Sequence, residues 1–424
     1  MLDRQDSYIQ ILIEELVPAM GCTEPICIAY AAAKATEVLG CEPDKIIVQC
    51  SGNIIKNVKS VTIPNSGNLR GIEASAVLGA VGGTASKELE VLNEVSDESI
   101  SRTHELVAIP GYCSVELLDT VIPLHLILTV YKGAEEATVE IKHSHANISK
   151  ITKNNEVLLE NVEDADKYLG VFKDRSILNV ADIKEFADTV DLSRIKTLLA
   201  TQIEYNMCIA NEGLTGNYGL GIGKILLQNY QNDVVTKIKA YASAGSEARM
   251  SGSILPVVTN SGSGNQGMAS SIPIIIYATE KDKNEEQLYR SLAFANLITI
   301  HQKTYIGRLS AFCGAVSAAC ASGAAITYIE GGTLEQIKNT IINTLANISG
   351  IVCDGAKPSC ASKIASSLDA AIMAHHLAMN GRVYEPFTGL VQNDVEQTIG
   401  CIGRLGKEGM KQTDIEILNM MLGN

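Results

Sequence analysis

Apolar residues recur every three or four positions over most of the chain. This spacing runs through residues 7–20, SYIQILIEELVPAM, and resumes in 26–40, ICIAYAAAKATEVLG, after a GCTEP turn. It returns from about residue 196 and continues almost to the end of the chain. Such spacing is typical of helices that bury one face or lie wholly in a core. The pattern therefore predicts a mainly helical part formed by residues 1–94 and 196–424.

The pattern changes between residues 95 and 195. In LHLILTVYKG, residues 124–133, and EEATVEIKHSHANISKI, residues 135–151, apolar and polar residues alternate. Alternation with a period of two indicates half-buried strands. We therefore expect an α+β protein, predominantly α-helical, with a smaller α/β module inserted at 95–195. His143 and His145 lie in this module without a third metal ligand near them in the sequence, which favours a solvated strand over a metal site.

Composition narrows the class of protein. The chain has 424 residues, of which 46% are hydrophobic and 19% charged, which is typical of a globular protein with a large core. A formal net charge of −14 argues against nucleic acid or an anionic membrane as a partner. The first residues carry no secretory signal, and the apolar runs are far shorter than the ~20 residues of a membrane-spanning helix. We expect a cytoplasmic protein whose eleven cysteines are thiols or ligands, not disulfides.

Three cysteines lie among glycine, alanine and serine. Cys313 is part of SAFCGAVSAACASGAA, residues 310–325, and Cys353 and Cys360 are part of GIVCDGAKPSCASKIASS, residues 350–367. Thiolates on turns of small residues suit an iron–sulfur cluster, because sulfur ligands match iron and the cluster needs room. The spacing fits neither a zinc ribbon nor a ferredoxin. Buried packing residues are the alternative, since free cysteine is among the most buried residue types.

The GCTEP turn places another thiol where a helix begins. Thr23 is the expected N-cap, and Cys22 therefore lies at or just before the helix N-terminus. The free N–H groups and the dipole at such an end lower the pKa of a thiol. We expect Cys22 to be a reactive thiolate.

Two glycine-rich polar loops are candidates for binding a carboxylate. One loop begins at residue 65 with NSGNLRG, and the other begins at residue 259 with TNSGSGNQG. Backbone N–H groups, hydroxyls and amides in such turns suit an anion, although ordinary turns and helix caps share this composition. The candidate residues are Asn65, Ser66, Gly67, Thr259, Asn260, Ser261 and Gly262.

Together these motifs resemble the L-cysteine desulfidase family over essentially the whole chain, and more distantly the alpha part of iron–sulfur L-serine dehydratases. The resemblance rests on GCTEP at 21–25, VVTNSGSGNQG at 257–267, FCGAVSAACASG at 312–323 and CDGAKPSCASK at 353–363. In the dehydratases the last two cysteines lie further apart, and no thiol stands at the place of Cys22. These differences favour cysteine over serine as the substrate.

The resemblance implies a 4Fe–4S cluster held by Cys313, Cys353 and Cys360, with one iron left open. It implies β-elimination of L-cysteine to pyruvate, ammonia and hydrogen sulfide, with Cys22 as the base. Thr23 and Lys357 join the two loops as candidate substrate-binding residues. The expected partner is this small molecule, and self-association into a homo-oligomer is left open.

Two other activities are alternatives. Serine or threonine could be deaminated on the same cluster, because only the leaving atom differs. A pyridoxal-phosphate lyase would use SGSGNQG, residues 261–267, as a phosphate cup, but no lysine stands in a recognisable Schiff-base context. A non-enzymatic sensor is disfavoured because no DNA-binding motif accompanies the cysteines.

Overall fold

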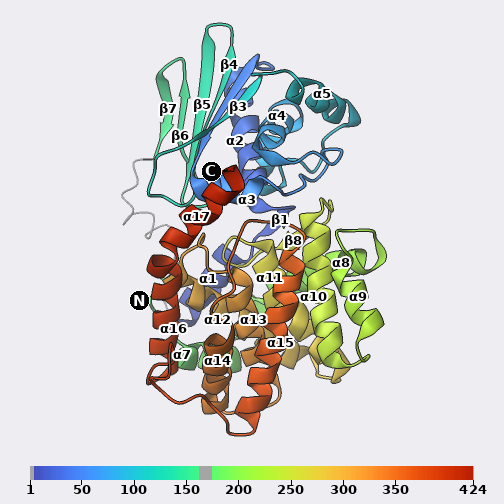
Figure 1. The fold of residues 1–424 in the computed structure, drawn as a ribbon, viewed down its shortest axis with the longest axis vertical. Coiled ribbons are helices and arrows are strands. Elements are labelled where there is room, and N and C mark those ends of the chain that lie inside the picture. Colours follow the sequence, from blue (N-terminus) through green and yellow to red (C-terminus); the bar gives the residue numbers. More distant parts are fainter. Residues whose placement is uncertain (1–3, 162–173, 424) are drawn as a thin grey trace.

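The computed structural model describes residues 4–161 and 174–423, and Figure 1 shows a sheet-containing upper part above a helical lower part. The fold is α+β and mostly helical, as the sequence predicts. The upper part contains α2 (Thr23–Leu39), β2 (Lys45–Cys50), α3 (Gly52–Val58), α4 (Gly71–Gly82), α5 (Asp97–Val107), β3 (Cys113–Leu117), β4 (His125–Lys132), β5 (Glu135–Lys142), β6 (Ile148–Lys153) and β7 (Glu156–Glu160). The lower part contains α1 (Arg4–Glu15), α7 (Val180–Thr189), α8 (Lys196–Thr215), α9 (Ile222–Asn229), α10 (Val234–Met250), α11 (Gly264–Glu280), α12 (Glu285–Ile306), α13 (Gly314–Ile329), α14 (Leu334–Ile348), α15 (Cys360–Met379) and α16 (Val395–Arg404).

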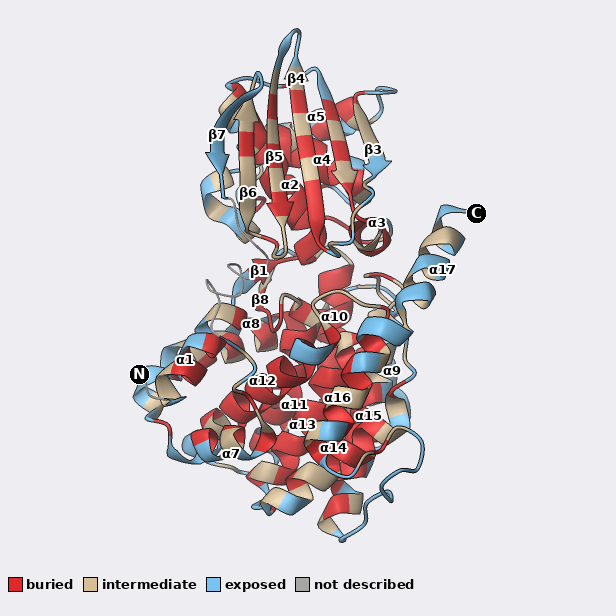
Figure 2. Ribbon diagram, turned by 90° about the vertical axis from the view of Figure 1, so that its left-hand side faces the viewer, coloured by how far each residue is buried: buried red, intermediate tan, exposed pale blue. Residues whose placement is uncertain are grey.

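The upper part is a six-stranded sheet in the order β3-β2-β4-β5-β6-β7, with helices on one face. Strand β2 is parallel to β3 and antiparallel to β4, and β4 to β7 follow one another as antiparallel neighbours. Buried residues alternate along β4 and β5, because only one face of the sheet packs on α2 and α4 (Figure 2).

The expected 95–195 module needs a correction. Strand β2 comes from the preceding segment, yet it lies inside the sheet between β3 and β4, where Val48 pairs with Leu128. Helix α7 and the residues after it belong instead to the core of the helical part. Strands 113–160 alone would leave an apolar face and an unpaired edge, which β2, α2 and α4 cover. Periodicity reveals a strand but not its distant partners, which is why the boundary expected from the sequence is wrong.

The helical part owes its close packing to small side chains. Buried residues fill α10 to α13 and α15 (Figure 2), and many of them are alanine, serine or glycine. A Cβ atom at Gly213 of α8 would lie 2.1 Å from the carbonyl oxygen of Ala244 on α10. Only glycine allows these two helices to approach so closely.

Among the residues that the structure describes, segments from distant places in the sequence meet where the two parts join. Strand β1 (Pro18–Met20) pairs antiparallel with β8 (Pro256–Val258) just below α2. Helix α17 (Lys411–Leu422) leaves the helical part and packs on α3 of the upper part (Figure 1). The junction between the parts is therefore held by segments from the start, the middle and the end of the chain.

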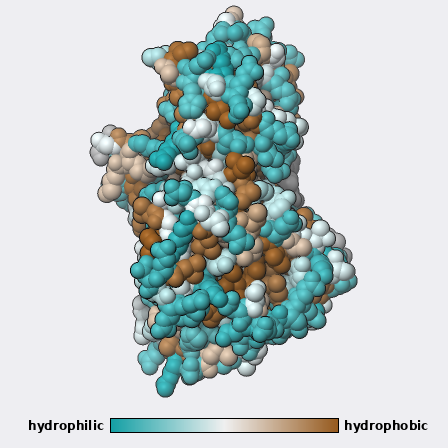
Figure 3. Space-filling view, turned by 90° about the vertical axis from the view of Figure 1, so that its right-hand side faces the viewer, coloured by the Kyte–Doolittle hydropathy of each residue, from teal (hydrophilic) through white to brown (hydrophobic). Residues whose placement is uncertain are grey.

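The surface is largely polar, with apolar side chains gathered over the helical part on the face that Figure 3 shows. Exposed apolar residues of the helical part include Leu220, Ile225 and Met373. In residues 4–161 and 174–423, no helix has the length and apolar character to cross a membrane.

Candidate active site

A cavity lies at the junction of the two parts. Residues from both parts line it. The upper part contributes Cys22, Glu24, Asn57 and His145, and the helical part contributes Arg249, Ser261, Gly262, Gln266, Lys303, Arg308, Cys313, Cys353 and Cys360, among others. The cavity therefore contains the thiols that the sequence motifs single out, although they are up to 338 positions apart along the chain.

The three cysteines of the predicted cluster site come from the ends of two helices and a loop. Cys313 is the N-cap of α13, Cys360 is the first residue of α15, and Cys353 lies in the loop before α15. Backbone hydrogen bonds fix the two loops together, because the N–H of Cys353 donates to Ala311 at 2.6 Å and that of Cys313 donates to Ile351 at 3.1 Å. Their thiols therefore face one cavity, and their role as ligands stays a prediction.

The electrostatics of these thiols suit a positively charged metal group. Burial, and then the neighbouring Cys353 and Cys360, raise the pKa of Cys313 to about 12. Burial, and then Cys353, also raise the pKa of Cys360. Iron bound by these thiols would remove this mutual repulsion, because each thiolate would then face a cation.

The cavity wall next to the cysteines leaves room for a bulky group. Gly314, Ala315, Gly355 and Ala356 line it, so no long side chain fills the space. Within the described residues, no three His, Cys, Asp or Glu side chains are grouped to hold a single metal ion. A cluster has a different requirement, because each cysteine binds a different iron and the thiols lie further apart. The donor set therefore fits a cluster better than one ion.

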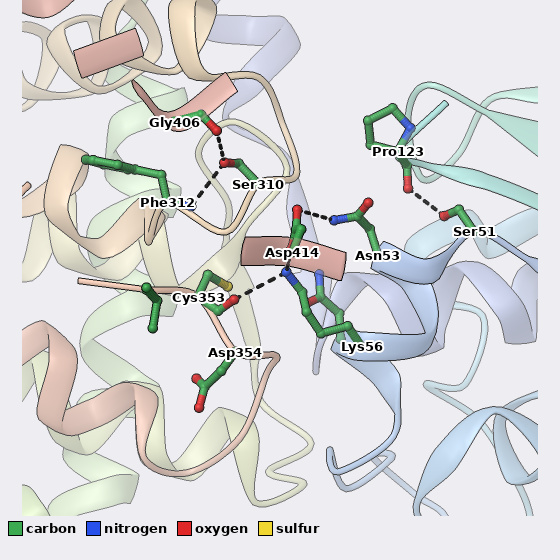
Figure 4. A network of polar contacts seen from close by, with 12 residues as sticks. Ser51, Asn53, Lys56, Pro123, Ser310, Phe312, Cys353, Asp354, Gly406 and Asp414 are labelled. Carbon is green, nitrogen blue, oxygen red and sulfur yellow. Dashed lines mark hydrogen bonds and ion pairs between the residues drawn. The ribbon is translucent and has the colours of Figure 1, made fainter. Parts of the chain in front are cut away.

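A buried lysine supports the loop that carries Cys353. Lys56 of α3, only 2% exposed, donates to the carbonyl oxygen of Cys353 at 3.2 Å and forms an ion pair with Asp414 of α17 (Figure 4). Asn53 also donates to Asp414, at 3.0 Å. Nearby, Ser310 donates to Gly406 at 2.7 Å (Figure 4). The C-terminal segment thus helps to position the cysteine loops.

Cys22 corrects one expectation. It is itself the N-cap of α2, one residue before the expected Thr23, and its side chain makes no capping hydrogen bond. Burial, and then the negative charge of Glu24, raise the pKa of Cys22 well above its ordinary value. Position at a helix end does not lower the pKa here, because desolvation outweighs the dipole. The thiol is therefore protonated in the free protein.

Glu24 is the centre of a buried polar cluster. Its carboxylate accepts hydrogen bonds from Cys22 at 3.1 Å, from Thr23 at 3.1 Å and from Asn57 at 2.9 Å. His145 Nε2 lies 3.9 Å from Glu24 Oε1. Burial alone would raise the pKa of Glu24, but His145 and the donated hydrogen bonds outweigh it and lower the pKa. Glu24 is therefore a carboxylate that connects a thiol with an imidazole.

The two loops predicted to bind a carboxylate lie in different places, and only the loop that begins at residue 259 reaches the cavity. Ser261 and Gly262 line the cavity, both with positive φ, whereas Thr259 and Asn260 are buried behind them. Asn260 donates to Asn296 Oδ1 at 2.9 Å, so its amide holds the loop in place. Thr23 lies beside the cavity and reaches Gly262 O at 3.0 Å.

The other loop is not part of the cavity wall. Asn65 donates to Leu92 O at 2.8 Å and Ser66 donates to Ile63 O at 2.7 Å. A Cβ atom at Gly67 would meet His104. Lys357 forms an ion pair with Asp354 and is also absent from the cavity lining. These polar groups already have partners outside the cavity, so their positions do not support a place for them at the substrate.

Sequence reasoning missed several cavity residues: Glu24, Asn57, His145, Arg249 and Gln266. The alternating pattern predicts a solvated strand at His145, but this residue lies in the turn between β5 and β6 and is 5% exposed. Arg249 gave a usable signal, because it is the basic residue in the last turn of an alanine- and serine-rich helix. Glu24 and Gln266 lie within the motifs GCTEP and VVTNSGSGNQG, whereas Asn57 has no distinguishing pattern around it.

Comparison with known proteins establishes the family. Residues 86–419 match the model of the serine dehydratase alpha chain family. The chain belongs to this family. Its relatives include a UPF0597 protein of Lachnoclostridium phytofermentans, 50% identical over 98% of this chain and 99% of the relative, and one of Treponema denticola, 47% identical over 99% and 98%. A UPF0597 protein of Desulfitobacterium hafniense is 49% identical over 99% of this chain and 98% of the relative.

The match to the serine dehydratase alpha chain family covers only part of the cavity. It includes His145, Arg249 and the three cysteines of the predicted cluster site, whereas Cys22, Glu24 and Asn57 precede it. The UPF0597 relatives, by contrast, align with nearly the whole chain. The thiol and carboxylate at the start of α2 therefore lie outside the segment that matches the family model.

Proposed function

We propose that the chain is an L-cysteine desulfidase that eliminates sulfide from L-cysteine and yields pyruvate, ammonia and hydrogen sulfide. One observation carries the proposal: Cys313, Cys353, Cys360 and Cys22 line the same cavity, next to a buried carboxylate and imidazole. Membership of the serine dehydratase alpha chain family supports a lyase reaction at the β-carbon of an amino acid.

Cys313, Cys353 and Cys360 would hold a 4Fe–4S cluster. When bound, an iron that lacks a protein thiolate supplies a Lewis acid for the substrate sulfur, which makes sulfide a better leaving group. The chain itself keeps the thiols on fixed backbone, through the hydrogen bonds of Cys353 and Cys313 to Ala311 and Ile351. Lys303, whose pKa burial lowers to about 8 while Cys353 and Cys313 oppose the shift, lines the cavity beside them.

In this proposal, Cys22 is the base that removes the Cα proton of the substrate. Its thiol is protonated in the free protein, so the proton must leave Sγ before the sulfur can act as a base. Glu24 accepts the hydrogen bond from Sγ, and His145 lies on the other side of the same carboxylate. The S–H bond breaks and an O–H bond forms on Glu24, the carboxylate that already accepts the hydrogen bond from Sγ. The thiolate of Cys22 then takes the proton from the substrate carbon.

L-Serine dehydration is the second candidate function, favoured by the name of the matching family. The same residues would act, with water instead of hydrogen sulfide as the product. Cys22 distinguishes the two activities, because the resemblance to iron–sulfur serine dehydratases provides no thiol at that position.

The test uses protein purified without oxygen and with its iron measured. L-Cysteine and L-serine are supplied in parallel without pyridoxal phosphate, and pyruvate and sulfide are assayed. Pyruvate with an equal amount of sulfide from cysteine, and little pyruvate from serine, is the expected result. Turnover of serine alone would move the chain to the dehydratases, and no product from either in iron-loaded protein would overturn both candidates.

A further inference from the structure

We propose that Arg249 and Asn57 recognise the carboxylate and the ammonium group of an α-amino acid, each from a different part of the molecule. The inference deepens the proposed function and rests on it for the identity of the substrate. It concerns two cavity residues to which no sequence motif pointed, and it explains polar atoms that are otherwise buried without partners.

Arg249 is fixed in position with one nitrogen unused. The side chain is 2% exposed, and its Nε donates to Gly21 O at 2.8 Å while Nη1 donates to Asn265 Oδ1 at 3.2 Å. Its Nη2 is buried and has no hydrogen-bond partner in the part of the chain that the structure describes. Because two nitrogens are held and the residue lines the cavity, the third is available to a ligand.

The charge of Arg249 requires an anion. None of the acidic side chains described by the structure forms an ion pair with it, unlike Arg308 of the same cavity, which pairs with Glu15 at 2.9 Å. A buried guanidinium without a counter-charge is costly, and a carboxylate is its natural planar partner. Lys303 is the remaining cavity cation of this kind, but it lies beside Cys313 and Cys353. Arg249 is therefore the group best placed to bind the substrate carboxylate.

The backbone makes room for this guanidinium. A Cβ atom at Gly264, the first residue of α11, would lie 2.5 Å from Nε and 2.7 Å from Cζ of Arg249. A side chain at position 264 would press on the guanidinium and also on Val257, whose Cγ2 would lie 2.6 Å away. The glycine thus serves the placement of Arg249.

Asn57 offers an acceptor of fixed orientation. Its Nδ2 donates to Glu24 Oε1 at 2.9 Å, and because a carboxylate can only accept, the amide cannot be reversed. The other atom, Oδ1, is buried with no hydrogen-bond partner among residues 4–161 and 174–423. A substrate ammonium group would satisfy it. Gln266 Oε1, which is also buried and without such a partner, is a second acceptor on the cavity wall.

These two contacts place the amino acid across the junction. Asn57 belongs to α3 of the upper part and Arg249 to α10 of the helical part. Recognition of both charged groups selects α-amino acids over thiols that lack either one.

The experiment compares two thiol probes that each lack one group. 3-Mercaptopropionate has the carboxylate but no amine, and cysteamine has the amine but no carboxylate. Binding of each to anaerobic, iron-loaded protein is measured by calorimetry. Arg249→Gln should weaken 3-mercaptopropionate about 100-fold, the loss expected for one charged hydrogen-bonded pair, and should leave cysteamine unchanged. Asn57→Ala should show the reverse selectivity. Lys239→Gln, which removes an exposed ion pair of the same helix with Asp369, should change neither.

A second variant guards against misfolding. Gly264→Ala retains the arginine and displaces it, so it should also weaken 3-mercaptopropionate selectively, with circular dichroism and iron content as in the parent protein. Equal losses for both probes, or no loss in Arg249→Gln, would overturn the inference. If neither cysteine nor serine is turned over while the selective losses persist, the proposed function fails and the recognition by Arg249 and Asn57 stands. If cysteine is turned over with an unchanged KM in Arg249→Gln, the proposed function stands and the recognition by Arg249 fails.

Discussion

The thiol of Cys22 donates a hydrogen bond to Oε2 of Glu24 at 3.1 Å, and both side chains are buried. The two residues stand at the first turn of α2, where it meets the helical part of the molecule. Because the carboxylate stabilises the protonated thiol, the pair holds a proton at the edge of the cavity instead of a free thiolate. Reactivity at Cys22 therefore depends on where that proton can go.

Replacement of Cys22 by alanine should separate proton transfer from cluster assembly. We expect Cys22→Ala to keep its iron and its visible absorbance but to lose about 100-fold or more in kcat, the usual contribution of a positioned acid or base. Pyruvate production and iron content are the measurements. Cys27→Ala is the matched control, because Cys27 is buried on the same helix outside the cavity lining. Activity of Cys22→Ala equal to that of the control would end the proposed role.

The three predicted ligands should differ from other buried cysteines in iron content. Cys313→Ala, Cys353→Ala and Cys360→Ala should each lose most of the iron, because a cluster loses one of its protein anchors. Cys320→Ala provides the comparison: Cys320 is buried in α13, seven positions after Cys313, and its thiol approaches Ile341 O at 3.8 Å instead of the cavity. The measurement is the iron content of each variant purified without oxygen. A variant that retains all of its iron would remove its cysteine from the ligand set.

The ion pair of Lys56 with Asp414 should stabilise both the junction and the cysteine loop. Asp414→Ala leaves the ammonium of Lys56 buried without its partner, and loss of one member of a buried pair costs about 3–5 kcal/mol. Asp414 is one-fifth exposed, so we expect the lower end of this range. The free energy of unfolding in denaturant and the rate of iron loss to a chelator are the measurements.

Glu416→Ala on the same helix is the control for Asp414→Ala, because its side chain bonds only Gln412 among the described residues. If iron loss is as slow in Asp414→Ala as in this control, Lys56 does not support the loop of Cys353.

Acid should destabilise the helical part through His375. Burial, and then His376, lower its pKa from 6.5 to about 4. The unfolded chain binds a proton at higher pH than the folded chain, so stability is full above about pH 6.5 and falls as pH falls towards 4. The shift corresponds to about 3 kcal/mol at most. His375→Gln should flatten the unfolding free energy between pH 6.5 and 4, measured by urea titrations, and an unchanged slope would contradict the assignment.

The fold class was predictable because local patterns report local structure. Helical spacing identified the helices of the lower part, and alternation identified β4 and β5. Which elements pack together was harder to predict from the sequence, because β2 joins a sheet whose other strands begin over sixty positions later. Strand pairing depends on apolar faces that meet only in three dimensions, and the sequence does not record which ones do.

The candidate site also contains residues that the sequence could predict and residues that it could not. Small residues around Cys313, Cys353 and Cys360, and the turn at Cys22, mark these thiols in the sequence because bulky neighbours would close the space. The turn at Asn65 carries similar residues, yet Asn65 already donates to Leu92 O and Ser66 to Ile63 O. Composition indicates that a loop is polar and tight, but not whether its polar groups remain available.

The sequence by itself determined the mainly helical architecture, the family and the cysteines that face the cavity, because each depends on residue type and spacing. Only the tertiary structure decided the protonation of Cys22 and the presence of His145, Asn57 and Arg249 beside it. A pKa and an unpaired polar atom are set by burial and by neighbours from distant segments. Those neighbours meet only where the sheet part closes onto the helical part.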